Sequence, residues 1–160
     1  MLNKTIHGDT KISNFLFSKS NYNVSALIDL DTCTSAPILF DLADCVRSCC
    51  NPKGEDTLDI EGVYFDLELY ENCLLGYLSL PNTILSTSEI YYLPYSIRTV
   101  TFELGLRFIS DYFRGNIYFE TQDDSHNLRR SEVQFKFHQS IISNWKEIII
   151  LTNKICKSSQ

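Results

Sequence analysis

Short apolar runs separated by polar residues characterise the first thirty positions of the chain. Residues 4–6, 15–17 and 24–28 are rich in Ile, Phe, Leu and Val, a composition that favours β-strands. The segment between the second and third runs, Ser18 to Asn23, contains the Ser and Asn residues typical of a hairpin turn. The pattern predicts a small antiparallel β element whose polar residues lie in loops and at strand ends.

After residue 32 the apolar side chains recur every three or four positions, which predicts helices. The expected helices are residues 40–50, residues 61–79, a short helix or turn at 86–92, a helix opened by Pro94 and ended by Gly115, and a long amphipathic helix from Leu128 to Thr152. Residues 117–119 look extended. We therefore expect an α+β, mostly helical chain in which a small β element precedes a helical bundle.

Charge and composition exclude several classes of partner. The formal net charge is −6 and the sequence contains no basic tract, which argues against nucleic acid and against an anionic membrane as the main partner. The first residues form no apolar signal segment, and no apolar run approaches membrane-spanning length. The six cysteines form no C-x-x-C pair; we interpret them as small buried side chains in a reducing cytoplasm.

An acidic loop carries the candidate chemistry. Asp9 is followed five positions later by Asn14, and the strand ending at Ile28 is followed by Asp29. Phosphoryl transfer needs a carboxylate to receive the hydroxyl proton and oxygen ligands for Mg²⁺. Asp9 suits the first role, Asn14 and Asp29 suit the second, and Lys11 could neutralise charge beside Asp9 or contact the γ-phosphate. Taken singly, each could instead be a turn or strand-end residue.

The same residues resemble a known family. The segments His7-Gly8-Asp9-Thr10-Lys11-Ile12-Ser13-Asn14, Ile28-Asp29-Leu30-Asp31-Thr32 and Phe40 to Arg47 resemble the aminoglycoside phosphotransferase and choline kinase group, and within it the N-acetylhexosamine kinases. The stretches Thr101 to Phe108, Tyr118-Phe119 and His126 to Phe135 are also similar. The resemblance implies the C-terminal lobe of a protein-kinase-like fold.

The resemblance further implies an ATP- and Mg²⁺-dependent kinase that converts an N-acetylhexosamine to its 1-phosphate. It assigns the base to Asp9, the metal ligands to Asn14 and Asp29, and the sugar contacts to Asp31, Arg107 and Tyr118. Carboxylate and guanidinium groups hydrogen-bond sugars, and an aromatic face packs on the ring. Two alternatives stay open: Arg107 could form a surface ion pair with Glu103, and Tyr118 could be a core residue.

The family's N-terminal lobe has no counterpart in this sequence. None of the six glycines forms a G-x-G, and no Lys-bearing strand precedes the acidic loop. We expect one partial domain over 1–160, with the catalytic loop and metal-binding strands in 1–32 and a helical substrate-binding subdomain in 38–156. The chain alone is then expected to be inactive and to need a missing N-terminal lobe, either from a longer chain or from an upstream polypeptide. The alternatives are a non-catalytic remnant or sugar-binding module, or a kinase for an aminoglycoside, choline or homoserine.

Overall fold

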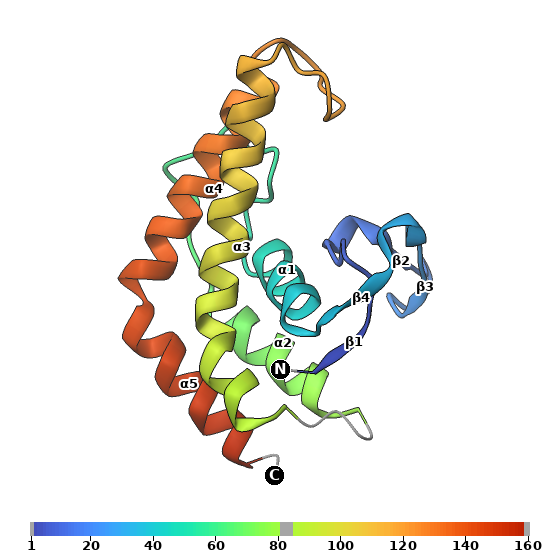
Figure 1. Cartoon of the computed structure of the whole chain (residues 1–160), viewed down its shortest axis with the longest axis vertical. Helices are drawn as coiled ribbons and strands as arrows, with labels where there is room; N and C mark the ends of the chain where they lie inside the picture. The colour runs from blue at the N-terminus through green and yellow to red at the C-terminus, as the bar shows by residue number, and fades with distance from the viewer. Residues whose placement is uncertain (1, 81–84, 159–160) are drawn as a thin grey trace.

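The structure is a computed structural model that describes residues 2–80 and 85–158. Two small antiparallel sheets and five α-helices make up the described chain (Figure 1). The elements are β1 (Asn3–Ile6), the 3₁₀ turn η1 (Ile12–Asn14), β2 (Phe15–Phe17), β3 (Val24–Leu27), the 3₁₀ turn η2 (Leu30–Thr32), β4 (Thr34–Pro37), α1 (Leu39–Cys49), α2 (Leu67–Leu78), α3 (Thr87–Phe113), α4 (His126–Ser143) and α5 (Trp145–Ser158). This architecture confirms the α+β, mostly helical class and is consistent with a fragment of a kinase-like fold.

The three expected strands are all present. Strands β2 and β3 form a hairpin whose turn closes through the Ser18 N–H, which donates to the Asn23 carbonyl at 2.8 Å. Strand β1 pairs with β4, from Asn3 opposite Pro37 to Ile6 opposite Thr34. The sequence did not predict β4, because Thr34-Ser35-Ala36-Pro37 is not an apolar run and its strand geometry comes from pairing with β1.

Two helix starts differ from the prediction. Helix α2 begins at Leu67 rather than at 61, because the Asp66 carboxylate accepts the N–H groups of Glu68 and Leu69 at 2.9 and 3.0 Å. Helix α3 is continuous from Thr87 to Phe113 with Pro94 inside it. A capping box between Ser86 and Glu89 starts the helix before Pro94, and the missing proline N–H removes only one internal hydrogen bond.

The last predicted helix is two helices. Helix α4 ends at Ser143, and α5 begins at Trp145 after Asn144, whose N–H bonds to the Ser140 carbonyl at 3.0 Å. Residues 117–119 are not a strand, because their N–H groups bond to the carboxylate of Asp111 instead of to a neighbouring strand.

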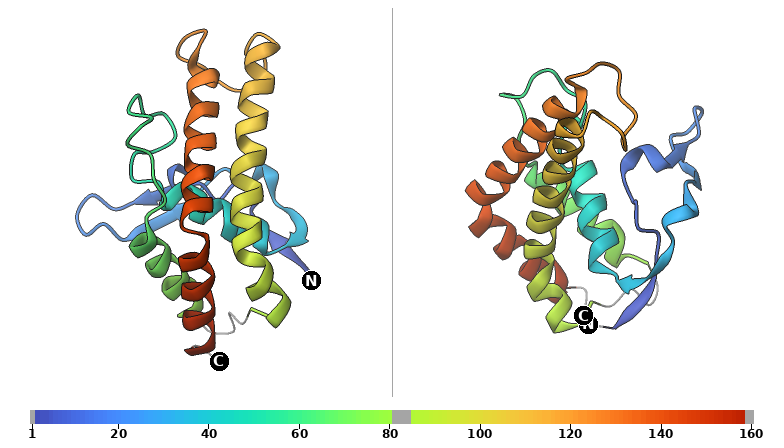
Figure 2. Two further views of the ribbon diagram at one scale, coloured as in Figure 1. Left: turned by 90° about the vertical axis from the view of Figure 1, so that its left-hand side faces the viewer. Right: turned by 45° about the horizontal axis from the view of Figure 1, so that its top comes forward.

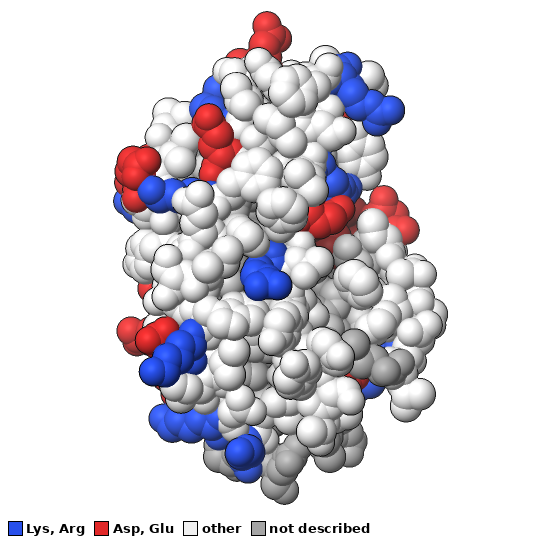
Figure 3. Space-filling view, turned by 60° about the vertical axis from the view of Figure 1, so that its left-hand side comes forward, with Lys and Arg blue, Asp and Glu red and all other residues white. Residues whose placement is uncertain are grey.

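The core lies among the helices, whereas the β element is peripheral (Figure 2). Val46 of α1, Tyr70 of α2, Ile97 of α3 and Ile148 of α5 are fully buried. Every residue from 21 to 35 is exposed. Charged side chains on the face shown in Figure 3 lie mainly towards its edges and leave broad uncharged areas between them.

The prediction that the cysteines are buried is confirmed only in part. Cys50 and Cys156 are buried, three others are half-buried, and Cys33 is exposed because it follows η2 on the outer side of the β element. All six are free thiols, and the Sγ atoms of Cys45 and Cys49 lie 3.9 Å apart on one face of α1. Among the described residues, no helix is both long and apolar enough to cross a membrane.

Candidate active site

The acidic loop is fixed to the first turn of α1 by Asp41. The Asp41 carboxylate accepts the His7 N–H at 2.7 Å and the Gly8 N–H at 2.8 Å, one on each oxygen. The Asp41 carbonyl accepts the Thr10 hydroxyl at 2.6 Å. Gly8 has φ +85°, and a Cβ there would lie 2.7 Å from the Thr32 carbonyl oxygen. Only glycine therefore lets the loop pass this close to η2.

His7 joins the loop to the end of β3. Its Nδ1 lies 3.2 Å from the Asp9 N–H and can only accept there, so the proton resides on Nε2, which donates to the Ile28 carbonyl at 2.9 Å. The Thr32 hydroxyl donates to the His7 carbonyl at 2.7 Å. These bonds hold the acidic loop against the segment that follows β3.

Asp9, Lys11 and Asn14 form one polar cluster at the tip of the loop. Lys11 Nζ lies 2.7 Å from Asp9 Oδ2, and the Asn14 Nδ2 group donates to the same oxygen at 3.0 Å and to the Asp9 carbonyl at 2.8 Å. Among the described residues, no donor binds Asp9 Oδ1. One carboxylate oxygen is thus held in place while the other stays available to accept a proton.

Asp29 lies beside this cluster in an unusual backbone conformation. Its φ of 68° and ψ of 57° are left-handed, a conformation that a few polar residues such as Asp tolerate and that often marks functional sites. The preceding Ile28 N–H donates to the Asn14 carbonyl at 3.0 Å, which ties the two predicted metal ligands to one point of the backbone. Asp29 and Asp31 are both exposed.

A cavity of about 980 Å³ lies between this cluster and the helices. It is lined by all but one of the residues predicted for the site: Asp9, Lys11, Asp29, Asp31, Arg107 and Tyr118. Asn14 does not line it and is buried behind Asp9. The fold therefore gathers side chains from the β element, from α3 and from the loop after α3 around one space.

Arg107 and Tyr118 lie at the wall formed by α3 and its following loop. Arg107 contacts Glu103 at 3.7 Å, so the ion pair considered from the sequence exists, and the Arg107 guanidinium also lies 5.6 Å from the Tyr118 ring. Tyr118 is 74% exposed and is not a core residue. The Asp111 carboxylate fixes its backbone by accepting the N–H groups of residues 117, 118 and 119 at 2.9–3.0 Å.

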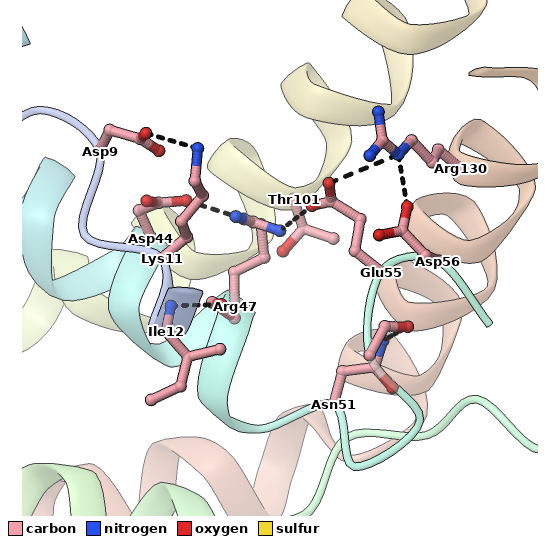
Figure 4. Close-up of polar contacts among 12 residues, drawn as sticks. Asp9, Lys11, Ile12, Asp44, Arg47, Asn51, Glu55, Asp56, Thr101 and Arg130 are labelled. Carbon is pink, nitrogen blue, oxygen red and sulfur yellow. Dashed lines mark hydrogen bonds and ion pairs between the residues drawn. The ribbon is translucent and has the colours of Figure 1, made fainter. Parts of the chain in front are cut away.

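Sequence reasoning missed a set of ion pairs from α1, α4 and the loop after α1 that also lines the cavity (Figure 4). Arg47 is almost fully buried and donates to Asp44 at 2.8 Å and to Glu55 at 2.9 Å, while Arg130 donates to Asp56 at 2.6 Å. All five residues line the cavity. The spacing of Asp44 and Arg47 on a helix indicates their pairing, but the approach of residues 55 and 56 requires the folded loop.

The charge of the cavity lining is acidic overall. Eight carboxylate residues and four Lys or Arg residues line it. Asp44 Oδ2 is buried without a hydrogen-bond partner among the described residues. Such a lining suits ligands that bring positive charge or hydrogen-bond donors, including divalent metal ions and hydroxyl groups.

No cluster of three or more His, Cys, Asp and Glu side chains within residues 2–80 and 85–158 is arranged to hold a metal ion. The donor set of Asn14 and Asp29 nevertheless fits Mg²⁺ chemistry, because Mg²⁺ uses one or two protein oxygens and completes its shell with phosphate and water. The Asn14 amide oxygen accepts no hydrogen bond from the described residues, which leaves it available as a ligand.

A comparison with protein families agrees with this geometry. Residues 5–72 match the family model described as the phosphotransferase enzyme family, APH. The matched segment runs from β1 into α2 and includes Asp9, Asn14, Asp29 and Asp41. The match shows that this segment, which is less than half of the chain, is similar to enzymes of the phosphotransferase family.

Proposed function

We propose that this chain carries the phosphoryl-acceptor half of an ATP-dependent kinase that phosphorylates a sugar hydroxyl. The most specific form of the proposal is conversion of an N-acetylhexosamine to its 1-phosphate, in a cytoplasmic setting. The observation that carries it is the shared cavity: Asp9, with one unbonded carboxylate oxygen, faces the same space as Asp31, Arg107 and Tyr118.

In this mechanism Asp9 Oδ1 accepts the proton of the attacking hydroxyl. The hydroxyl oxygen forms a bond to the γ-phosphorus while the bond from that phosphorus to the ADP oxygen breaks. Lys11 and Asn14 fix Asp9 Oδ2, so that the free oxygen keeps its direction. Asn14 and Asp29 would hold Mg²⁺, which neutralises phosphate oxygens when bound.

The sugar would lie between Asp31, Arg107 and Tyr118. A carboxylate accepts sugar hydroxyl protons, a guanidinium donates to ring or hydroxyl oxygens, and a tyrosine ring covers an apolar sugar face. Arg107 is half-exposed and its contact with Glu103 is long at 3.7 Å, so the guanidinium keeps donors for a ligand. Asp111 holds the Tyr118 backbone in place for this contact.

The nucleotide requires groups beyond those in the cavity. A G-x-G loop does not occur in these 160 residues, so we propose that a separate nucleotide-binding lobe packs on the β element. The surface offered is apolar: Leu16, Phe17, Val24 and Leu27 of the β2–β3 hairpin are 40–56% exposed. Exposed apolar patches of this kind mark interaction sites.

A kinase for a cationic substrate, such as an aminoglycoside or choline, is the second candidate. The observation that favours it is the acidic lining of the cavity, with eight carboxylates against four Lys or Arg residues. Carboxylates bind hydroxyl groups and ammonium groups alike, so a panel of neutral and cationic acceptors distinguishes the two candidates.

The test is a phosphotransfer assay of the chain, alone and co-expressed with a nucleotide-binding lobe of the same family. The acceptors are N-acetylglucosamine, N-acetylgalactosamine, kanamycin, choline and homoserine, and ³¹P NMR identifies the phosphorylated position. We expect a sugar 1-phosphate from the co-expressed pair and no product from the chain alone. Transfer only to kanamycin or choline would support the second candidate, and transfer to no acceptor would favour a non-catalytic sugar-binding module.

A further inference from the structure

Gln134 is a buried amide at the cavity wall that the proposed mechanism does not use. It lies on α4, is 2% exposed, and lines the cavity. Its Oε1 atom is buried and has no hydrogen-bond partner in the part of the chain that the structure describes. A buried polar atom without a partner is costly, so such atoms commonly await a ligand or a water molecule.

The packing of α3 against α4 keeps Gln134 in this position. Gly105 of α3 faces it, and a Cβ on Gly105 would lie 3.2 Å from the Gln134 Cβ and 2.8 Å from the Phe135 ring. The absence of a side chain at 105 therefore lets α4 approach closely. Arg130, one turn earlier on α4, does not bond to Gln134; its guanidinium donates to Asp56 and to the Glu120 carbonyl.

The chemistry of a carboxamide is distinct from that of the charged groups in the cavity. The other carboxamide of the lining, Asn51, is already paired with the Gly54 carbonyl and the Lys53 N–H. Carboxylates only accept hydrogen bonds and Arg and Lys only donate them, whereas a carboxamide does both within one plane. Exchange of its oxygen and nitrogen positions would leave the same pair of functions. The matching ligand group is another amide, whose N–H and C=O can pair with Gln134 without burying a charge.

We infer that Gln134 is a specificity-determining residue that binds the acetamido group of an N-acetylated sugar. The inference rests on the proposed function, because it assumes a sugar in this cavity. The acetyl methyl group has apolar surface available in the same cavity, where Val100, Leu104 and Phe108 of α3 contribute to the lining. A plain hydroxyl at the same sugar carbon would leave the acceptor or the donor of Gln134 unpaired.

The experiment is a binding titration of the full chain without nucleotide, by calorimetry or ligand-observed NMR. The ligands are N-acetylglucosamine and N-acetylgalactosamine, compared with glucose and galactose. The wild type should prefer the N-acetylated sugars by about tenfold, the effect of one or two hydrogen bonds. Gln134→Leu should remove that preference, and Gln134→Glu should reduce it, because a carboxylate cannot donate to the acetyl oxygen. Gln139→Leu, on the exposed side of the same helix, is the matched control and should keep it.

A thermal melt of the unliganded proteins separates a recognition role from a structural one. Leu is similar in size to Gln, and replacing an unpaired buried amide by an apolar group is neutral or stabilising. Gln134→Leu should therefore melt at or above the wild-type temperature, and a clearly lower temperature would overturn the inference. A preference that persists in Gln134→Leu would overturn it while leaving the proposed function intact. Absence of binding to all four sugars would overturn both.

Discussion

Asn14 and Lys11 both donate to the same oxygen of Asp9, at 3.0 and 2.7 Å. The two oxygens of the Asp9 carboxylate therefore differ. Oδ2 is fixed by two hydrogen bonds, and Oδ1 has no hydrogen-bond donor among the described residues. A general base requires this difference, because the oxygen that accepts the proton must point in a defined direction and must not already accept a hydrogen bond. The same arrangement also turns the Asn14 amide so that its own oxygen points away from Asp9 and can serve a metal ion.

The variant Asp9→Asn tests whether Asp9 Oδ1 accepts the proton. Asparagine can keep its oxygen on Lys11 and Asn14 while an NH₂ group replaces the accepting oxygen. In the enzyme assembled with a nucleotide-binding lobe, kcat should fall by about a hundredfold or more, the range attributed to a general base. The affinity for the sugar should change by less than about threefold, since Asp9 acts on the proton. Steady-state kinetics and a sugar titration measure the two effects, with the exposed Asp124→Asn as control. An unchanged kcat would remove Asp9 from the role of base.

Gly8→Ala should be more destabilising than substitution of another glycine with positive φ. Gly8 has φ +85°, and a Cβ added to it would lie only 2.7 Å from the Thr32 carbonyl oxygen. Gly54 has φ +76°, but a Cβ added to it would meet no atom within 4 Å. We expect a loss of about 1 kcal/mol in unfolding free energy for Gly54→Ala and of about 2–3 kcal/mol for Gly8→Ala. Gly76→Ala, in open space on α2, should stabilise by roughly 0.5–1 kcal/mol. Urea denaturation measures the unfolding free energy of all three variants. Equal losses of stability for Gly8→Ala and Gly54→Ala would show that the backbone at Thr32 moves away at little cost.

The β2–β3 hairpin and the acidic loop were predictable because their signals are local, whereas β4 depends on its pairing with β1. Alternating short apolar runs and turn residues specify the β2–β3 hairpin, and the spacing of Asp9, Asn14 and Asp29 indicated one site. The structure brings Asp9 and Asp29 to one cavity and holds Asn14 behind Asp9. Whether these residues perform the chemistry stays a prediction until turnover is measured.

The errors arise where distant contacts outweigh local preference. Val63 continues the apolar periodicity of α2, yet it is buried in the irregular segment before the Asp66 cap. Pro94 signalled a helix start, but the Ser86–Glu89 capping box begins the helix earlier. Gln134 reads as an ordinary polar helix residue, because its lack of a partner depends on the closeness of α3 to α4 at Gly105.

The exposed β2–β3 hairpin should make the isolated chain bind a hydrophobic dye. Phe17 is 47% and Val24 56% exposed, and they are opposite each other in the hairpin. The double variant Phe17→Ser, Val24→Thr should lose most of the dye fluorescence and reduce self-association, because it removes apolar area from one patch. Phe113→Ser is the control, since Phe113 is 79% exposed at the end of α3. Dye binding and light scattering measure both properties. Equal dye binding by the double variant and the wild type would place the apolar surface elsewhere.

Asp111 should make the stability of the chain depend on pH in the acid range. The Phe119 N–H, followed by those of Tyr118 and Ile117, holds the pKa of the Asp111 carboxyl below its ordinary value. The pKa of an Asp carboxyl in the unfolded state is about 3.9. Because the pKa of Asp111 is lower than this in the folded state, its carboxylate stabilises the fold at pH values above about 3.9. This stability is lost as the pH falls through the folded pKa. The difference in melting temperature between wild type and Asp111→Asn should therefore be largest near pH 7 and should shrink below about pH 4.

Circular dichroism melts from pH 2.5 to 7 measure this difference, and subtracting the variant curve removes the contributions of other acids such as Asp123, whose pKa is also lowered. Hydrogen exchange provides a local readout. The amides of Ile117, Tyr118 and Phe119 should exchange faster in Asp111→Asn at pH 7, because an amide oxygen is a weaker acceptor than a carboxylate. Asp124→Asn should change neither property. A melting-temperature difference that does not vary with pH would show that the charge of Asp111 does not hold the Tyr118 loop against Arg107.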